Sequence, residues 1–152
     1  METPTTDDLV PVLSFRLGTQ HYALLIADVV EVAAMVEMVK IADSRPEVVG
    51  MVNRHGAPLP LLDLRAIFGQ PTPPPTDSTL FVVVDDGSRM AGLVLDEVYQ
   101  VVYLTAEQLR GPSAAEGYIR CIISHKDELV QVIALKPLLA AYVTEQITDF
   151  EA

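Results

Sequence analysis

The sequence predicts a mainly β fold built from two small barrels with few helices. Three observations support this fold class. Valine- and isoleucine-rich segments are short and are separated by turn residues, as in small β proteins. The two halves of the chain resemble each other weakly, on either side of a proline-rich stretch at 70–78. Only two segments carry apolar residues at helical spacing.

Two hairpins are predicted, one near the start of each half. Val12–Leu17 alternates between apolar and polar residues, the chain turns at Gly18, and residues 21–26 return. The second hairpin pairs Leu80–Val84 with Met90–Leu95 around an Asp-Gly step, which is a strong turn signal. We expect both pairs to be antiparallel.

The other predicted strands follow the same apolar, β-branched pattern. They cover residues 29–38, 48–54, 59–62, 98–104, 119–124 and 129–134. Asp63-Leu64-Arg65 is typical of a capped helix start, and this short mid-chain helix should end near Gly69. A C-terminal helix is expected from about Lys136 to Ile147.

An internal repeat indicates how these elements are grouped. Shifts of 69 and 71 positions bring similar residues together: Gly18 with Gly87, Leu24 with Leu93, Val29 with Val98, Leu59 with Val130, and Leu61 with Val132. Two barrels of about five strands each would close and so remove exposed strand edges. We therefore expect one domain over 11–147, with barrels at roughly 11–69 and 79–147 joined by the connector 70–78. Acidic tails are expected at 1–10 and 148–152.

Composition limits the classes of partner. The net charge is −11, and the 10 Lys and Arg residues are scattered without a basic stripe, which argues against nucleic acid or anionic lipid as a ligand. Half of the residues are hydrophobic and the mean hydropathy is +0.32. No apolar run approaches the roughly 18–20 residues that span a bilayer, and the first residues do not form a signal peptide. We expect a cytoplasmic protein without direct membrane insertion, whose apolar surface contacts other proteins.

No catalytic residue, metal site or cofactor is predicted. The single cysteine, Cys121, excludes an internal disulfide, and its strand setting favours a buried structural role. No nucleophile elbow, phosphate-binding loop or zinc-binding helix motif occurs. An enzyme or ligand carrier would need a deep pocket with convergent polar groups, which the sequence alone does not test.

Two polar features interrupt the apolar strands. One is the turn Asn53-Arg54-His55-Gly56, and the other is Glu31, a lone charge among valines and alanines. Solvation alone would explain the turn. Alternatively, both features belong to the polar rim of a hydrophobic contact.

The ordered set of motifs resembles the CheW family of bacterial chemotaxis coupling proteins. The resemblance spans roughly residues 12–140, and it rests on the order and spacing of the pieces rather than on any single one. In this chain they are Phe15-Arg16-Leu17-Gly18, Tyr22-Ala23, Val29-Val30-Glu31-Val32, Pro46, Gly50-Met51-Val52-Asn53-Arg54-His55-Gly56, Pro58, Pro60, Asp63-Leu64-Arg65, and Gly92-Leu93-Val94-Leu95-Asp96-Glu97-Val98.

The resemblance implies two intertwined five-stranded SH3-like β-barrels without catalytic activity. It implies an adaptor that couples the regulatory domain of a CheA-type histidine kinase to the cytoplasmic tip of chemoreceptors, so that the protein would be cytoplasmic and peripheral at receptor arrays. By position, the receptor-binding residues would be Glu31, Asn53, Arg54, His55 and Gly56.

Arg54-His55 stands where the family has Leu-Arg. This departure leaves open an adaptor in a non-motility or pilus-type chemosensory pathway with a divergent partner. For the kinase contact, the irregular apolar stretch containing Met35, Val36 and Met38 is the candidate.

Overall fold

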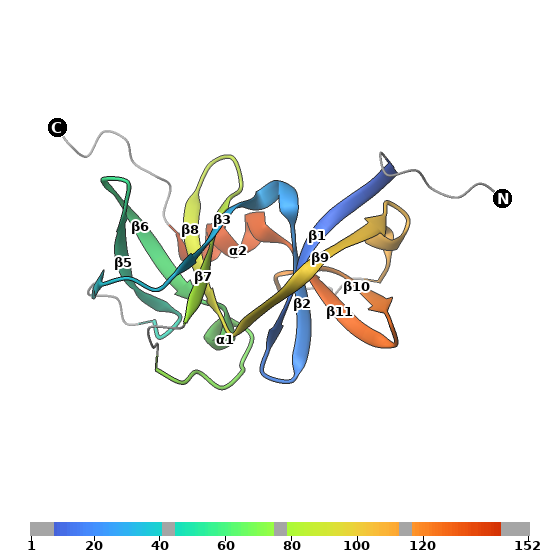
Figure 1. Ribbon diagram of the computed structural model, residues 1–152, viewed down its shortest axis with the longest axis horizontal. Helices are drawn as coiled ribbons and strands as arrows, with labels where there is room; N and C mark the ends of the chain where they lie inside the picture. Colours follow the sequence, from blue (N-terminus) through green and yellow to red (C-terminus); the bar gives the residue numbers. More distant parts are fainter. Residues whose placement is uncertain (1–7, 41–44, 75–78, 113–116, 144–152) are drawn as a thin grey trace.

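The computed structural model describes residues 8–40, 45–74, 79–112 and 117–143, and these residues form two β-sheets with few helices (Figure 1). The predicted mainly β class is confirmed. The first sheet has five strands in the order β10-β11-β2-β1-β9, and the second has six in the order β3-β7-β8-β6-β5-β4.

The strands and helices have the following bounds. In the first sheet they are β1 Leu9–Leu17, β2 Gln20–Leu25, β9 Glu97–Thr105, β10 Ile119–His125 and β11 Glu128–Ile133. In the second they are β3 Val29–Ala34, β4 Met38–Val39, β5 Val48–Arg54, β6 Ala57–Asp63, β7 Leu80–Asp85 and β8 Met90–Leu95. The helices are α1 Leu64–Ile67, α2 Leu135–Tyr142 and two short 3-10 segments, η2 Ile26–Asp28 and η3 Gln108–Arg110.

Each strand of the first sheet has a counterpart in the second, which bears out the internal repeat, and the two-residue β4 is an additional sixth strand of the second sheet. In each sheet one parallel pair joins two antiparallel hairpins: β11 with β2 in the first and β6 with β8 in the second. The registers correspond as well, because Val132 opposite Ala23 is the counterpart of Leu61 opposite Gly92 under the shifts of 71 and 69 positions.

The two sheets exchange one strand each. β3 follows β2 in the chain but pairs with β7 of the second sheet, whereas β9 follows β8 but pairs with β1 of the first (Figure 1). The two sheets therefore do not coincide with the barrels expected at 11–69 and 79–147, because each sheet contains strands from both of these stretches. Apolar patterning identifies a strand, but it does not identify the strand's partner, and this is why the sequence did not reveal the exchange.

Three boundaries differ from expectation. The predicted strand over 29–38 is divided into β3 and β4, and Leu9 and Val10 belong to β1 rather than to a tail, because they pair with Thr105 and Leu104. α2 ends at Tyr142, after which Val143 has extended backbone angles. The expected remainder of that helix and the tail 148–152 lie outside the described residues. Within the connector, residues 70–74 have no regular secondary structure and 75–78 are not described.

The largest hydrophobic cluster lies between the sheets and draws on both. Phe15 and Tyr22 from the first sheet meet Val82 and Leu93 from the second, and Leu138 of α2 packs with them. α2 lies between the sheets in Figure 1. Smaller clusters fill each barrel. Because the central cluster is shared, the two sheets form one packing unit.

A buried ion cluster fixes α1 to the strands around it. The Asp63 side chain caps the helix by accepting a hydrogen bond from the Arg65 backbone N–H at 3.0 Å. The Arg65 guanidinium donates to both Asp63 oxygens at 2.9 and 3.0 Å and to Asp96 at 3.3 Å. Asp96 also accepts from the Gly18 backbone N–H at 3.0 Å. The hydrogen bond to Asp63 raises the pKa of Arg65 above its ordinary value. The Asp-Leu-Arg motif is therefore a structural brace between the two sheets.

Candidate partner-binding site

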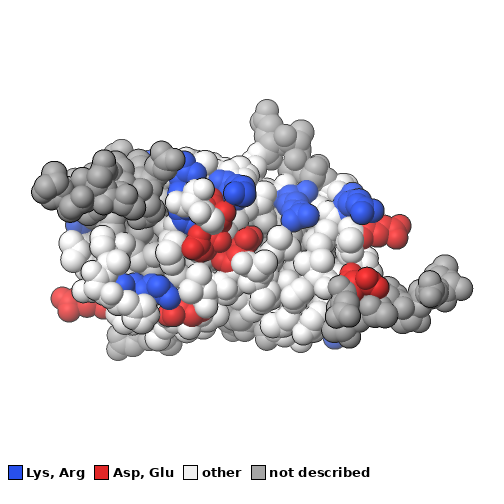
Figure 2. Space-filling model, turned by 90° about the horizontal axis from the view of Figure 1, so that it is seen from above, with Lys and Arg blue, Asp and Glu red and all other residues white. Residues whose placement is uncertain are grey.

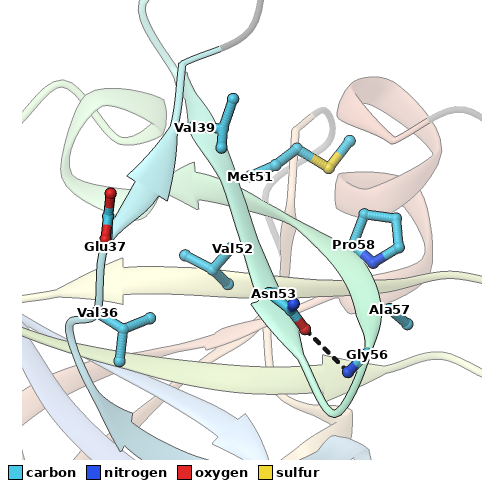
Figure 3. Close-up of a pocket in the computed structure, with 9 residues that line it drawn as sticks. All are labelled: Val36, Glu37, Val39, Met51, Val52, Asn53, Gly56, Ala57 and Pro58. Carbon is cyan, nitrogen blue, oxygen red and sulfur yellow. Dashed lines mark hydrogen bonds between the residues drawn. The ribbon is translucent and has the colours of Figure 1, made fainter.

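The turn Asn53-Arg54-His55-Gly56 joins β5 to β6 by a two-residue connection. His55 has φ 52° and Gly56 has φ 86°, the signs that a type I′ hairpin turn requires at both central positions. The Asn53 side chain accepts a hydrogen bond from the Gly56 backbone N–H at 2.9 Å, which fixes the turn (Figure 3). This geometry leaves His55 exposed at the tip.

An ion pair links this turn to β3. Arg54 Nη2 lies 3.0 Å from Glu31 Oε2, with the two side chains 23% and 42% exposed. β3 and β5 are not neighbours in the sheet order β3-β7-β8-β6-β5-β4. The ion pair therefore connects a strand at one end of this order to a strand near the other end. A partly exposed pair of this kind stabilises the fold by at most about 1 kcal/mol. The pair therefore mainly fixes where the two charges lie.

β3 contains a β-bulge, and most of its side chains are exposed. The pairing of β3 with β7 shifts register between Val29 and Glu31. Strict alternation predicts Val30 and Val32 on the face opposite to Glu31. In the structure both valines are exposed, by 46% and 44%, and so is Glu31. Apolar and acidic side chains of β3 therefore share exposed surface.

A groove of about 580 Å³ opens beside the turn. Its lining combines apolar side chains of β4, β5 and β6 with polar groups: Val36, Glu37, Val39, Met51, Val52, Asn53, Gly56, Ala57 and Pro58 (Figure 3). Val36 and Val39 are 52% and 69% exposed. An apolar floor with a polar rim is the usual composition of a protein-binding surface.

The structure brings the five candidate receptor-binding residues to one part of the second sheet. Glu31 contacts Arg54, Asn53 contacts Gly56, and His55 lies between them in the turn. The candidate kinase-contact residues separate into two groups. Met35 and Met38 pack against the hydrophobic cluster of the second barrel, whereas Val36 is exposed in the groove.

Sequence reasoning missed Val39, Met51 and Ala57 as parts of the groove. Successive side chains of a strand point to opposite faces, so Met51 should face away from its neighbour Val52. Val52 is 3% exposed and belongs to the core, so this alternation could have indicated that Met51 lies on the outer face of β5. Val39 gave no such signal, since its strand has only two residues.

The single cysteine is not part of this surface. Cys121 is fully buried in the first barrel, and burial raises the pKa of its thiol. Among the described residues, no three His, Cys, Asp or Glu side chains gather as a metal site. On the face drawn in Figure 2, Lys and Arg occur in small separate groups with acidic residues between and beside them. Within the described part of the chain, no helix is long and apolar enough to cross a membrane.

Comparisons with known proteins point to one family. A model of the CheW-like domain matches residues 11–143. The chemotaxis protein CheW of Klebsiella aerogenes is 35% identical over 98 residues, which are 64% of this chain and 59% of that protein. The probable chemotaxis protein CheW of Rhizobium etli is 24% identical over 138 residues, or 88% and 89% of the two chains. The chain thus spans somewhat less than two thirds of the Klebsiella relative but most of the Rhizobium one.

A solved structure has the same fold. The scaffolding protein TtCheW from Thermoanaerobacter tengcongensis superimposes with a TM-score of 0.80 at 24% identity, covering 91% of this chain and 98% of that one. The two SH3-like barrels expected from the sequence are therefore present.

Proposed function

The chain belongs to the family of CheW-like domains, and we propose that it is a non-catalytic adaptor that couples a CheA-type histidine kinase to chemoreceptors in chemotaxis signalling. The family match over most of the chain supports this role. In this role the protein is cytoplasmic and is held at membrane-associated arrays only through its partners.

The receptor tip binds at the surface formed by Glu31, Asn53, Arg54, His55 and Gly56. The observation that supports this assignment is convergence: β3 and the β5–β6 turn, 23 positions apart at Glu31 and Arg54, meet beside an apolar groove. A helix laid in an apolar groove with polar groups at its rim is a common mode of recognition. The exposed valines of β3 and Val39 of the groove supply the apolar contact.

Arg54 supplies the guanidinium of this surface. The family pattern has its arginine one position later, where this chain has His55. The pairing of Arg54 with Glu31 keeps a fixed cation beside the turn. We assign the kinase contact to the segment containing Met35, Val36 and Met38, with Val36 as its exposed residue.

Binding measurements test the proposal. The regulatory domain of a CheA-type kinase and a soluble receptor tip fragment are titrated separately into the chain by isothermal calorimetry. We expect both to bind, and no binding of either at tens of micromolar contradicts the adaptor role.

Charge reversal tests the receptor site. Glu31→Lys removes the ion pair and places a second cation beside Arg54, so receptor affinity should fall about tenfold while the melting temperature changes little. Glu107→Lys is the matched control, because Glu107 is an exposed acid that makes no side-chain cap hydrogen bond at η3. Equal loss of affinity in both variants would mean that net charge, and not this surface, governs the contact.

A further inference from the structure

Met51 differs in its surroundings from the other methionines that the structure describes. Those three pack against the hydrophobic cluster of the second barrel: Met35, Met38 and Met90. Met51 is not part of that cluster and lines the groove instead. The alternation along β5 explains the difference, because the neighbouring residue Val52 faces the core and Met51 faces outward. Among the described methionines, Met51 is therefore the one whose thioether borders the groove.

Strand pairing places Met51 among apolar side chains of the groove face. It lies opposite Val39 of β4 on one side and opposite Pro60 of β6 on the other. Residues directly opposite each other in antiparallel strands share one face of the sheet. Val39 is 69% exposed, while Met51 and Pro60 are half-buried. Figure 3 shows the Met51 side chain extending from β5 on the side of Pro58. Met51 thus lies beside Val39, which supplies part of the proposed receptor contact.

The first barrel carries a sulfur-free residue at the corresponding position. Under the shift of 71 positions Met51 corresponds to Ile122, which is also half-buried and also lines a cavity. An aliphatic side chain contains no sulfur for a peroxide to oxidise, whereas a thioether is oxidised readily. Met51→Ile is therefore a chemically inert variant whose side chain this fold already carries at the equivalent place.

We propose that Met51 is a site of reversible oxidation by hydrogen peroxide that controls the receptor contact, an inference that rests on the proposed function. The Met51 sulfur donates an electron pair to one peroxide oxygen, so that an S–O bond forms and the O–O bond breaks. The proton on the transferred oxygen passes to the departing hydroxide, which leaves as water. The thioether is oxidised to the sulfoxide and the peroxide is reduced. Methionine sulfoxide reductases reverse the change with a dithiol that becomes a disulfide.

The sulfoxide weakens the contact through its oxygen. This oxygen is a hydrogen-bond acceptor, and Asn53 carries the only donor among the side chains that line the groove, because the acid Glu37 accepts when it is ionised. Asn53 lies two positions from Met51 on β5 and so on the same face. The oxygen therefore either takes the Asn53 amide donor away from the receptor or is buried without a partner, which is unfavourable. We expect receptor affinity to fall about tenfold.

Peptide mapping of the full chain tests the site. The chain is treated with hydrogen peroxide, and mass spectrometry of its proteolytic fragments gives the rate of sulfoxide formation at each methionine. We expect Met51 to be oxidised several-fold faster than Met35, Met38 and Met90, whose side chains pack against the cluster. Met1 lies outside the described residues and is followed in its own fragment. A rate at Met51 that does not exceed those of the three packed methionines would overturn the inference without reference to any partner.

Calorimetric titration with the receptor tip fragment tests the consequence. The oxidised chain should bind about tenfold more weakly than the untreated chain, and the reductases should restore the affinity. Met51→Ile should bind like the untreated chain and keep its affinity after peroxide. Met51→Gln places an amide oxygen in the groove and should bind weakly without oxidant. Met90→Leu is the matched control, because it removes a packed methionine of the same barrel and should stay as sensitive to peroxide as the unchanged chain.

The possible failures are distinguishable. Unchanged affinity after complete oxidation of Met51 would overturn this inference and leave the proposed function standing. An equal loss of affinity in peroxide-treated Met51→Ile would also overturn it, because the sensitive group would then lie elsewhere. A receptor fragment that does not bind the untreated chain contradicts the proposed function itself, and that result is visible before any oxidant is added.

Discussion

Replacing Arg65 by methionine should destabilise the protein more than any comparable change at its surface. Arg65 is 3% exposed and Asp63 is 7% exposed. Arg65→Met removes the two hydrogen bonds to Asp63 and the contact with Asp96, while the volume of the side chain is largely kept. Two carboxylates then remain in or near the core without their cation.

The magnitude follows from what is left behind. Removing one partner of a buried ion pair costs about 3–5 kcal/mol, because the remaining charge is desolvated without compensation. For a chain of this size each kcal/mol lowers the melting temperature by roughly 2–4 °C, so we expect a fall on the order of 10 °C. Arg65→Lys keeps the charge but loses the paired hydrogen-bond geometry, so its melting temperature should lie between those of the unchanged chain and of Arg65→Met.

Urea unfolding followed by circular dichroism measures the effect. Arg54→Met is the matched control, since it removes the same kind of side chain from an ion pair of 3.0 Å that is partly exposed. We expect that control to lose at most about 1 kcal/mol. In the double variant Asp63→Asn, Arg65→Met, part of the stability should return, because fewer uncompensated charges remain.

Equal losses in Arg65→Met and Arg54→Met would refute this reasoning. A double variant less stable than Arg65→Met would do the same, because it would show that the Asp63 carboxylate stabilises the fold through groups other than Arg65.

Two further predictions concern a half-buried acid, Asp28, and a crowded glycine, Gly92. Burial, with a smaller contribution from the charge of Asp86, raises the pKa of Asp28 above 3.8 in the folded protein. The folded state therefore binds this proton more tightly than the unfolded state, and stability contributed by the protonated acid is lost as the pH rises through the unfolded and then the folded pKa. Asp28→Asn should remove this loss, so the stability of the variant relative to the unchanged chain should increase between acidic pH and pH 7. Urea titrations of both proteins at several pH values measure this change. A difference in unfolding free energy that stays constant with pH would contradict the prediction. A Cβ on Gly92 would lie 2.5 Å from Leu61 Cδ2 and 2.8 Å from Phe81 Cδ2, so Gly92→Ala should cost about 1–3 kcal/mol in thermal unfolding. The corresponding residue of the first barrel is already alanine, Ala23, and an unchanged melting temperature for Gly92→Ala would show that the core adjusts without cost.

Local chemistry made much of the fold predictable from the sequence. Asp63 and Gly69 were expected to begin and end a short helix, and they do so through a side-chain cap and a residue at φ 70°. The hairpin around Gly87 was likewise predicted by its turn residues, and Gly87 has φ 97°. In each case the signal lies within a few residues of the structure that it specifies.

Features that depend on distant partners were not predictable. β3 has a bulge at Val30, and no property of the β3 sequence distinguishes it from a regular strand. The ion pair of Glu31 with Arg54 joins residues 23 positions apart on strands that are not neighbours in the sheet. The candidate residues were therefore found by resemblance, while their contacts required coordinates.

The strand exchange changes what the connector between the two halves means. A chain cut at the connector would leave β1 and β2 without β9, β10 and β11, and it would leave β3, β5 and β6 without β7 and β8. Neither half contains a complete sheet, so the connector joins parts of one cooperative unit and does not divide independent domains. Glu31 lies in β3 of the second sheet, and the short segment η2 alone separates β3 from β2 of the first sheet. A shift at the proposed receptor surface therefore acts on a strand of the second barrel that is connected to the first barrel by only three residues.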